Sequence, residues 1–403
     1  MSSGRPELDT DLYTDQAILD PYPSYRAIRD RGPAVWLTAH QTWAIGRFHD
    51  VRAALLASDV LLSGHGVAMN DALNVPDSRI TLTSDGELHR QLRGVVMRPM
   101  TASAVREIQD DIQRLADALV DDLLARGSFD GVADVAAHLP VAVVSHLVGL
   151  PESGRERMRD WAAATFDALG PMNARAQNGL GSVSEMIAYA AAVERSALRP
   201  DGWAARLFRA ADEGQIGASD VPTMLIDYIA PSLDTTILGT GHLLYQLGRN
   251  PEQWDLVRAQ PDLVARAVDE ALRLEAPVRA FSRLAAVDHR VDGTTIPAGS
   301  RVLVLFGSAN RDERRYADPD RFDVTRDAKD HVGFGHGVHR CAGAFLAQLE
   351  MQSLLRAMAA RVERIEVGEP EVALNNVLRG YASFAATFRP LAARRAGRLT
   401  ARA

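Results

Sequence analysis

The chain has 403 residues, of which 47% are hydrophobic and 24% charged, and its formal net charge is −7. This composition is typical of a globular protein, and the acidic balance argues against a general nucleic-acid binder. A single cysteine, Cys341, excludes an internal disulfide and any metal site that needs several cysteines. We expect a cytoplasmic protein without a membrane anchor, because the sequence shows neither a basic and apolar leader nor an apolar run of about 20 residues.

The first half of the chain predicts helices interrupted by a short β portion. No internal repeat or linker divides the sequence, so we expect one domain over residues 1–403. The segment after DPYP predicts a helix over about Pro23–Arg31, and AVWLT and TWAIG predict two short strands after it. Apolar residues at helical spacing then predict a helix from Ser103 to Gly127, where the glycine ends it.

The longest helical pattern runs from SDVPTM to Asn250–Pro251. Ser219 or Asp220 can cap its start, and Pro222 suits its first turn. About 30 residues with a rise of about 1.5 Å each predict a helix about 45 Å long. After the helix VARAVDEALRL, the stretch DHRVDGTTIPAGSRVLVLF predicts short strands with a hairpin turn at Asp292–Gly293. The pattern as a whole indicates a mainly α fold with a smaller β portion.

Three interpretations compete for Cys341, which lies in the loop FGHGVHRCAG just before the helix AGAFLAQLEMQSLLRAMAARV. It is a buried core cysteine, as lone cysteines often are, or a nucleophile with His339 or His336 as its base, or the thiolate ligand of a haem iron. Nothing marks the oxyanion hole that a nucleophile needs. The third interpretation fits the loop, since a helix start favours a thiolate, glycines let backbone approach a flat macrocycle, and Phe334 can shield the sulfur.

The same loop resembles the haem-binding loop of the cytochrome P450 family, the haem-thiolate monooxygenases. The matching pattern is Phe-x-x-Gly-x-His-x-Cys-x-Gly, here Phe334, Gly337, His339, Cys341 and Gly343. Gln348 stands where some members have an arginine. The resemblance covers essentially the whole chain. It implies the family's triangular, mainly helical fold, with haem b between the long helix and the helix that follows the cysteine.

The resemblance implies partners for the haem propionates. These are His89 and Arg93 in HRQLR, Arg283 in FSRLA, and His339 in the cysteine loop. Taken alone, His89 and Arg93 would be an ordinary solvated pair on one helix face.

A second implied group is structural. Glu270 and Arg273 resemble the family's Glu-x-x-Arg motif, although such a pair is also routine in helices. Arg321 in ADPDRF is expected to complete a Glu–Arg–Arg cluster that holds the scaffold on the cysteine side.

The segment PSLDTT lies within the predicted long helix, and Asp234 and Thr235 there resemble the family's acid–alcohol pair. The resemblance implies that they deliver protons during cleavage of the O–O bond, whereas alone they would be expected to bond locally to backbone carbonyls. Pro231 and Ser232 replace the usual alanine and glycine. Because proline has no N–H, the carbonyl of Asp227 loses its helical partner and a kink is predicted. We hypothesise that Pro231 fixes an opening in the helix and that Ser232 adds a hydroxyl near oxygen or substrate.

The implied reaction places one atom of O2 on a small or medium hydrophobic or aromatic substrate by hydroxylation or O-dealkylation. Electrons would come from NAD(P)H through a ferredoxin and its reductase, and neither nucleic acid nor membrane is an expected partner. An acidic ferredoxin would need a basic docking surface, for which Arg340, Arg90 and Arg98 are candidates. Ordinary surface charge is the alternative explanation of these arginines.

The expected substrate pocket is largely apolar and is drawn from several segments, namely Phe166, Leu169, Met172, Ser232, Val278, Phe281 and Phe384. The segments FGSANRD, HVGFGHGVHRC and NNVLRG look most like the branch that demethylates para-methoxybenzoates. That branch anchors the carboxylate partly with Arg and Ser, where this chain has Asp227 and Tyr228. Because Asp227 would repel a carboxylate, we expect a neutral phenol, aryl ether or natural-product intermediate.

Two other interpretations stay open. The first is an atypical haem-thiolate enzyme that carries out oxidative coupling or nitration in natural-product biosynthesis. The second is a non-catalytic haem-binding sensor. Asp234 and Thr235 argue against the sensor, because a sensor needs no proton relay.

Overall fold

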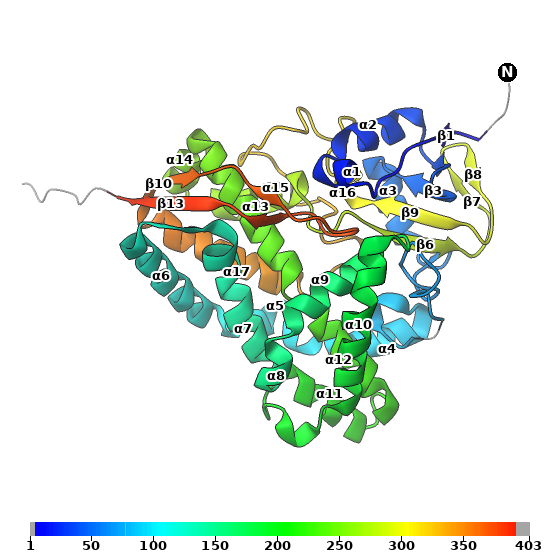
Figure 1. Cartoon of the computed structure of the whole chain (residues 1–403), viewed down its shortest axis with the longest axis horizontal. Coiled ribbons are helices and arrows are strands. Elements are labelled where there is room, and N and C mark those ends of the chain that lie inside the picture. Colours follow the sequence, from blue (N-terminus) through cyan, green and yellow to red (C-terminus); the bar gives the residue numbers. More distant parts are fainter. Residues whose placement is uncertain (1–4, 77, 392–403) are drawn as a thin grey trace, which may run out of the picture.

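A computed structural model describes residues 5–76 and 78–391, so both ends of the expected domain lie outside the described residues. Figure 1 shows a triangular outline in which helices dominate and strands gather toward one edge. The longer helices follow one another through the chain. They are α2 (Tyr22–Arg31), α3 (Phe48–Leu56), α4 (Gly86–Val96), α6 (Gln109–Arg126), α7 (His138–Val148), α9 (Met158–Ala168), α10 (Ala174–Ala192), α11 (Trp203–Asp212), α12 (Val221–Ile229), α13 (Asp234–Arg249), α14 (Pro251–Ala259), α15 (Leu263–Leu274) and α17 (Ala344–Ala359).

Short helices and turns connect these elements. They are α1 (Asp15–Leu19), α5 (Ala102–Glu107), α8 (Glu152–Arg155), α16 (Phe306–Ala309), η1 (Thr81–Thr83), η2 (Arg98–Met100), η3 (Gly131–Ala136), η4 (Arg195–Ala197), η5 (Ala218–Asp220) and η6 (Gly337–His339). The strands are β1 (Glu7–Leu8), β2 (Val35–Leu37), β3 (Thr42–Ile45), β4 (Leu61–Leu62), β5 (Ser128–Asp130), β6 (Ala280–Ala285), β7 (His289–Val291), β8 (Thr294–Ile296), β9 (Arg301–Leu305), β10 (Val362–Val367), β11 (Glu371–Val372), β12 (Tyr381–Ser383) and β13 (Ala385–Pro390).

The largest sheet joins strands from the start of the chain to two strands from its second half. Its strand order is β1-β2-β3-β9-β6-β4, so β9 pairs on one side with β3, far from it in sequence, and on the other with β6. The antiparallel pair β6 and β9 sets Arg283 opposite Val302. A second sheet has the order β10-β13-β5, and β7 pairs with β8 as β11 does with β12. The pairing of β6 with β9 therefore fixes the position of Arg283 within the largest sheet.

Several sequence predictions are confirmed. Helix α2 begins one residue before the predicted Pro23, and β2 and β3 lie within AVWLT and TWAIG. Asp292 and Gly293 both have positive φ, at 41° and 85°, as a tight hairpin turn between β7 and β8 requires. Local turn chemistry and apolar spacing were sufficient for these elements.

The helix predicted from Ser103 to Gly127 is two helices, α5 and α6, which meet at Ile108. The Ile108 amide donates to the Val105 carbonyl, three residues back, at 3.3 Å. This bond tightens the last turn of α5 and lets a new helix start. The apolar spacing continues across the break, so the sequence pattern did not reveal it.

The predicted long helix is also two helices, α12 and α13, separated by residues 230–233. The kink predicted at Pro231 is thus confirmed as a full interruption. Two hydroxyl groups satisfy carbonyls around it: Ser232 donates to Tyr228, and Thr235 donates to Pro231 at 3.0 Å. Such local bonds stabilise an opened helix.

One stretch, Gly131–Val148, is long and apolar enough by composition to cross a membrane. However, 61% of it is buried inside the protein, and its side chains belong to the main hydrophobic core. A core helix passes the same test, so the stretch is weak evidence for a membrane span.

Glu350 on α17 is a buried carboxyl group within this core. Its side chain is 2% exposed, and neither oxygen has a hydrogen-bond partner among the described residues. Burial raises its pKa from 4.5 to about 8. The folded protein therefore holds a proton that the unfolded chain releases between these two pH values.

We predict that Glu350→Gln removes this proton linkage. An acid with a raised folded-state pKa lowers stability as pH rises from its unfolded to its folded pKa. The variant and the wild type should be equally stable near pH 4.5, and the variant should gain on the order of 3 kcal/mol by about pH 8. Chemical unfolding at several pH values measures this difference. Glu363→Gln, an exposed position, is the matched control. A constant difference between Glu350→Gln and wild type would contradict the prediction.

Candidate active site

The loop around Cys341 is held by backbone geometry. The Cys341 amide donates to the Phe334 carbonyl at 2.8 Å, which closes the loop on itself. Gly335 and Gly337 have φ of 69° and 70°, a region that favours glycine. A Cβ atom at Gly337 would lie 2.5 Å from the Leu55 carbonyl oxygen, so the end of α3 also requires glycine there.

Opposing effects act on the Cys341 sulfur, which lies at the start of α17. Burial is the largest and raises the pKa of the thiol, while the amides of Gly343 and Ala344 and the charges of Arg340 and Arg93 lower it. The Cys341 side chain is nevertheless exposed to solvent. A thiol that is accessible and yet closely surrounded by protein lies on a concave surface. A Cβ atom at Gly343 would meet nothing within 4 Å, so there is room beside the sulfur.

Three elements, α4, β6 and η6, bring the predicted propionate partners together. His89 and His339 have ring centroids 4.2 Å apart, and the Nε2 atom of each is buried without a hydrogen-bond partner among the described residues. Burial lowers the pKa of His89 to about 4 and also lowers that of His339. Arg93 donates to the Arg340 carbonyl, which ties this group to the cysteine loop.

Arg283 in β6 is the buried cation of the group, with 4% exposure. Burial lowers its pKa to about 10, and its Nη1 donates to the neighbouring Ser282 carbonyl at 2.7 Å. Asp85 lies close to this group, 3.5 Å from His339 Nε2, and its oxygens also accept the amides of Ser63 and Gly64. Buried donors without partners are costly, so this cluster fits a ligand that brings anionic oxygens, as the haem propionates would.

The structural pair Glu270 and Arg273 lies in α15 with both side chains 0% exposed. Two bonds of 2.7 and 2.9 Å join them. The prediction that the Arg321 side chain completes this cluster is wrong. Arg326 Nε lies 3.2 Å from Glu270, whereas the Arg321 side chain is exposed and only its carbonyl accepts from Arg273. No motif marks Arg326, which reaches Glu270 because the 317–326 segment folds back over α15.

Asp234 and Thr235 begin α13 directly after the helix interruption. Burial raises the pKa of Asp234 to about 6, and Arg159, 3.9 Å away, opposes this shift. The Thr235 and Ser232 hydroxyls make the local bonds to carbonyls described above, as the residues taken alone would predict. Their predicted roles near oxygen stay predictions.

The apolar pocket residues are only partly gathered. Phe166, Leu169, Val278 and Phe281 belong to one hydrophobic cluster with Val377, Leu378 and Leu238. Phe384 lies elsewhere, in the main core, where its ring occupies the space beside Gly131. Met172 is 37% exposed at the surface. The structure therefore does not bring these last two residues to the cluster.

Sequence reasoning missed a second buried ion-pair group. Glu275 is paired with Arg311 and Arg379, each at 2.7 Å, and accepts from the Tyr22 hydroxyl. The arginines lower the pKa of Glu275 to about 2, despite its burial. Arg311 and Arg379 lie in FGSANRD and NNVLRG, so these two segments anchor the fold. The resemblance of both segments to one branch of the family was the available signal.

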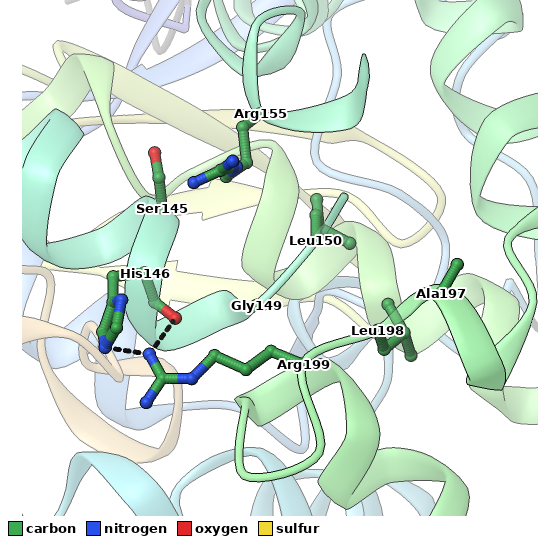
Figure 2. A pocket seen from close by; sticks show the side chains of 8 residues that line it. All are labelled: Ser145, His146, Gly149, Leu150, Arg155, Ala197, Leu198 and Arg199. Atoms are coloured by element: carbon green, nitrogen blue, oxygen red, sulfur yellow. Dashed lines mark hydrogen bonds between the residues drawn. The ribbon is translucent and has the colours of Figure 1, made fainter. Parts of the chain in front are cut away.

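Figure 2 shows a second pocket, and none of the residues that line it belongs to the cysteine loop. Its volume is about 330 Å³. Arg155 and Arg199 line it together with the end of α7. Arg199 is already paired with Asp201 at 2.7 Å and donates to the His146 carbonyl. It therefore caps a helix C-terminus, and we assign this pocket no catalytic role.

An accessible thiol just before a helix, with buried Arg283 and two unpartnered histidine nitrogens close to it, fits a haem-thiolate site. The family model described as Cytochrome P450 matches residues 195–363. The chain is 35% identical over 387 residues to Cytochrome p450 CYP199A2 of Rhodopseudomonas palustris, with 94% of each chain covered. It is 32% identical over 369 residues to cytochrome P450 monooxygenase PikC of Streptomyces venezuelae, with 88% of this chain and 87% of PikC covered.

Solved structures agree with these relatives. CalO2 matches with a TM-score of 0.82 and 29% identity, covering 95% of this chain and 99% of CalO2. Epothilone D-bound P450epoK matches with a TM-score of 0.83 and 26% identity, covering 95% and 100%. The chain therefore belongs to the cytochrome P450 family. The predicted P450 fold is confirmed, the protein is a P450 monooxygenase, and its cofactor is haem b, supplied with electrons by redox partners.

The corrected ion-pair cluster gives a direct stability test. Arg326→Ala removes a charged partner from buried Glu270 and should lower the free energy of unfolding by about 1–3 kcal/mol. Arg321→Ala removes an exposed side chain and keeps its carbonyl, so the change should stay within about 0.5 kcal/mol. Urea unfolding followed by circular dichroism compares the two variants. A larger loss for Arg321→Ala would restore the original assignment.

Proposed function

We propose that this enzyme uses O2 to hydroxylate or O-dealkylate a small or medium hydrophobic substrate, with Cys341 as the ligand of the haem iron. The observation that carries the proposal is the accessible thiol close to buried Arg283 and to two buried histidine nitrogens without hydrogen-bond partners among the described residues. Haem, when bound, supplies the iron for O2 chemistry, and the Cys341 thiolate would donate electron density to that iron. His89, Arg93, Arg283 and His339 would hold its propionates.

Phe334 and Gly343 complete the proposed cofactor site. Phe334 is half-buried between His331 and Arg340, where its ring can limit the access of water to the sulfur. Gly343 leaves room beside the sulfur, as described above. Both residues act on the thiolate by position and not by charge.

Asp234 would hold and pass protons during the reaction. With a pKa of about 6, its carboxyl group exchanges a proton readily near neutral pH. Arg159 can approach its ionised form from α9. Thr235 would join the relay by exchanging its bond to the Pro231 carbonyl for another acceptor.

The proposed substrate is hydrophobic, because Phe166, Leu169, Val278 and Phe281 form one apolar cluster. Solved relatives with similar folds hold epothilone D in P450epoK and pseudoionone in CYP268A2 of Mycobacterium marinum. A neutral phenol or aryl ether remains the preferred class. Asp227, expected to repel a carboxylate, is buried, and its oxygens accept hydrogen bonds from Thr81.

The proposed electron donor is a ferredoxin served by an NAD(P)H-dependent reductase, in a cytoplasmic protein with one domain over residues 1–403. Arg340 is exposed beside the ligand, and its guanidinium lies 6.0 Å from the ring of exposed Phe345. Leu56 and Val338 are exposed apolar residues near the same loop. Arg98 is exposed too, whereas Arg90 pairs with Glu87. A cation beside apolar surface suits an acidic partner.

The ligand assignment is tested by Cys341→Ala. Under carbon monoxide, the dithionite-reduced wild type should show a strongly red-shifted Soret band that the variant lacks, because the thiolate donates electron density to iron. His336→Ala, in the same loop but outside the proposed haem set, should keep the band. A band that survives in Cys341→Ala would contradict the assignment. O2-dependent product formation by the wild type then separates an enzyme from a sensor.

The docking surface is tested by Arg340→Gln. NAD(P)H, an acidic [2Fe–2S] ferredoxin and its reductase should form the reduced carbon monoxide complex about 3–10-fold more slowly than with wild type at low salt. The difference should shrink at high salt, since exposed charges are screened. Arg90→Gln is the control, because its charge is already paired with Glu87. Equal rates for Arg340→Gln and wild type would show that Arg340 is not part of the docking surface.

A further inference from the structure

The loop of residues 78–84, called here the 78–84 loop, connects to α12 through two acidic side chains. Asp220 and Asp227 are seven residues apart, which places them two turns apart on one helix face. Each binds a residue of the loop. The two contacts lie within three residues of each other in the loop, at Arg79 and Thr81.

The first contact joins Arg79 to Asp220. Arg79 binds both carboxylate oxygens, with an Nη2–Oδ2 distance of 2.7 Å, and this bond lowers the pKa of Asp220. Asp220 is 1% exposed, whereas the Arg79 side chain is 41% exposed, so the pair joins a buried carboxylate to a cation at the surface. Arg79 has a φ of 55°, which is costly for a residue with a side chain. The ion pair therefore holds the loop in a conformation that its backbone does not favour.

The second contact joins Thr81 to Asp227. The Thr81 amide lies 3.0 Å and its hydroxyl 2.7 Å from Asp227 Oδ2. The buried carboxyl group has its pKa raised to about 6, and the bonds from the loop oppose that shift. These donors are what makes a buried carboxylate tolerable at this position. Without the Thr81 donors, the Asp227 carboxyl group would lose its main hydrogen-bond partners.

The loop behaves as one unit because it is bonded internally. Ser84 donates to the Thr81 carbonyl at 3.0 Å, and the hydroxyls of Ser78 and Thr83 are 2.5 Å apart. Movement at Thr81 would therefore move the whole 78–84 loop. The loop leads directly into Asp85 and α4, which carries His89 and Arg93.

The position of the clamp links it to the reaction site. Asp227 lies four residues before Pro231, where the helix opens, and Asp234 begins α13 just beyond that opening. The 78–84 loop thus contacts α12 from its N-cap, Asp220, to Asp227 near its end. Its turn η1 also contacts α4, so the loop lies between α12 and the helix that carries His89 and Arg93.

Resting on the proposed function, we infer that Asp220 and Asp227 are positioning residues that clamp the 78–84 loop to α12 and so restrict which molecules enter the site. They touch no reacting atom. The clamp favours compact substrates, because a closed loop admits small molecules and must open for bulky ones. Its release raises the fraction of protein that is open to bulky ligands.

Ligand binding to the ferric holoenzyme tests the clamp without knowledge of the substrate. Imidazole is the small probe and 4-phenylimidazole the bulky one, and stopped-flow absorbance records their association rates. Asp227→Asn and Asp220→Asn should each raise the 4-phenylimidazole rate about 10-fold and the imidazole rate less than about 2-fold. Asp212→Asn, an exposed carboxylate on α11 paired with Arg195, should match wild type.

A double-mutant cycle separates the clamp from a general loss of stability. Arg79→Met, Asp220→Asn and the double variant should give nearly the same 4-phenylimidazole rate, since each breaks the same contact. Unchanged rates in both aspartate variants, additive effects in the cycle, or equal acceleration of both probes would overturn the clamp. If wild type itself lacks the red-shifted carbon monoxide band, the proposed function fails instead, which keeps the two failures distinguishable.

Discussion

The buried ion pair between Glu270 and Arg273 is the interaction on which the cysteine side of the molecule depends. Arg273 also donates to the carbonyls of Asn310 and Pro319, at 2.8 Å each, and Glu270 accepts the Asp323 amide at 3.0 Å. One pair of charges on α15 thus fixes segments that would otherwise be long irregular loops. Burial of two unpaired charges would be costly, so the segments and the pair stabilise each other.

The cysteine loop inherits its position from this scaffold. Asn310 Oδ1 accepts the Val332 amide at 2.8 Å, which connects the segment held by Arg273 to the start of the loop. From there the chain passes Phe334 and turns at two glycines with positive φ before it reaches Cys341. The loop backbone therefore places the sulfur just before α17, where the amides of Gly343 and Ala344 meet it. This arrangement leaves the thiol accessible for a ligand.

The opposite side of the site depends on a helix that is interrupted. Pro231 removes one donor, and hydroxyls at Ser232 and Thr235 satisfy nearby carbonyls, so the opening costs less than an unpaired backbone would. The 78–84 loop is bonded to α12 just before this opening. The two sides differ in design: buried charges hold the cysteine side, and an exchangeable set of hydrogen bonds surrounds the opening. Rigid ligation and adjustable access are both useful to an enzyme that binds one cofactor permanently and substrates in turn.

Sequence alone determined what local chemistry decides. The proposed thiol ligand, the glycines around it, the helix-breaking Pro231 and the Asp292–Gly293 turn follow from residue type and spacing, and the five-position cysteine pattern was specific enough to indicate the fold. Tertiary structure decided the contacts between distant segments. Arg326 and not Arg321 reaches Glu270, Phe384 packs beside Gly131 in the main core, and Asp227 binds Thr81, 146 residues away. Local periodicity carries no information on which side chains meet after the chain folds, because those meetings depend on how helices and loops pack together.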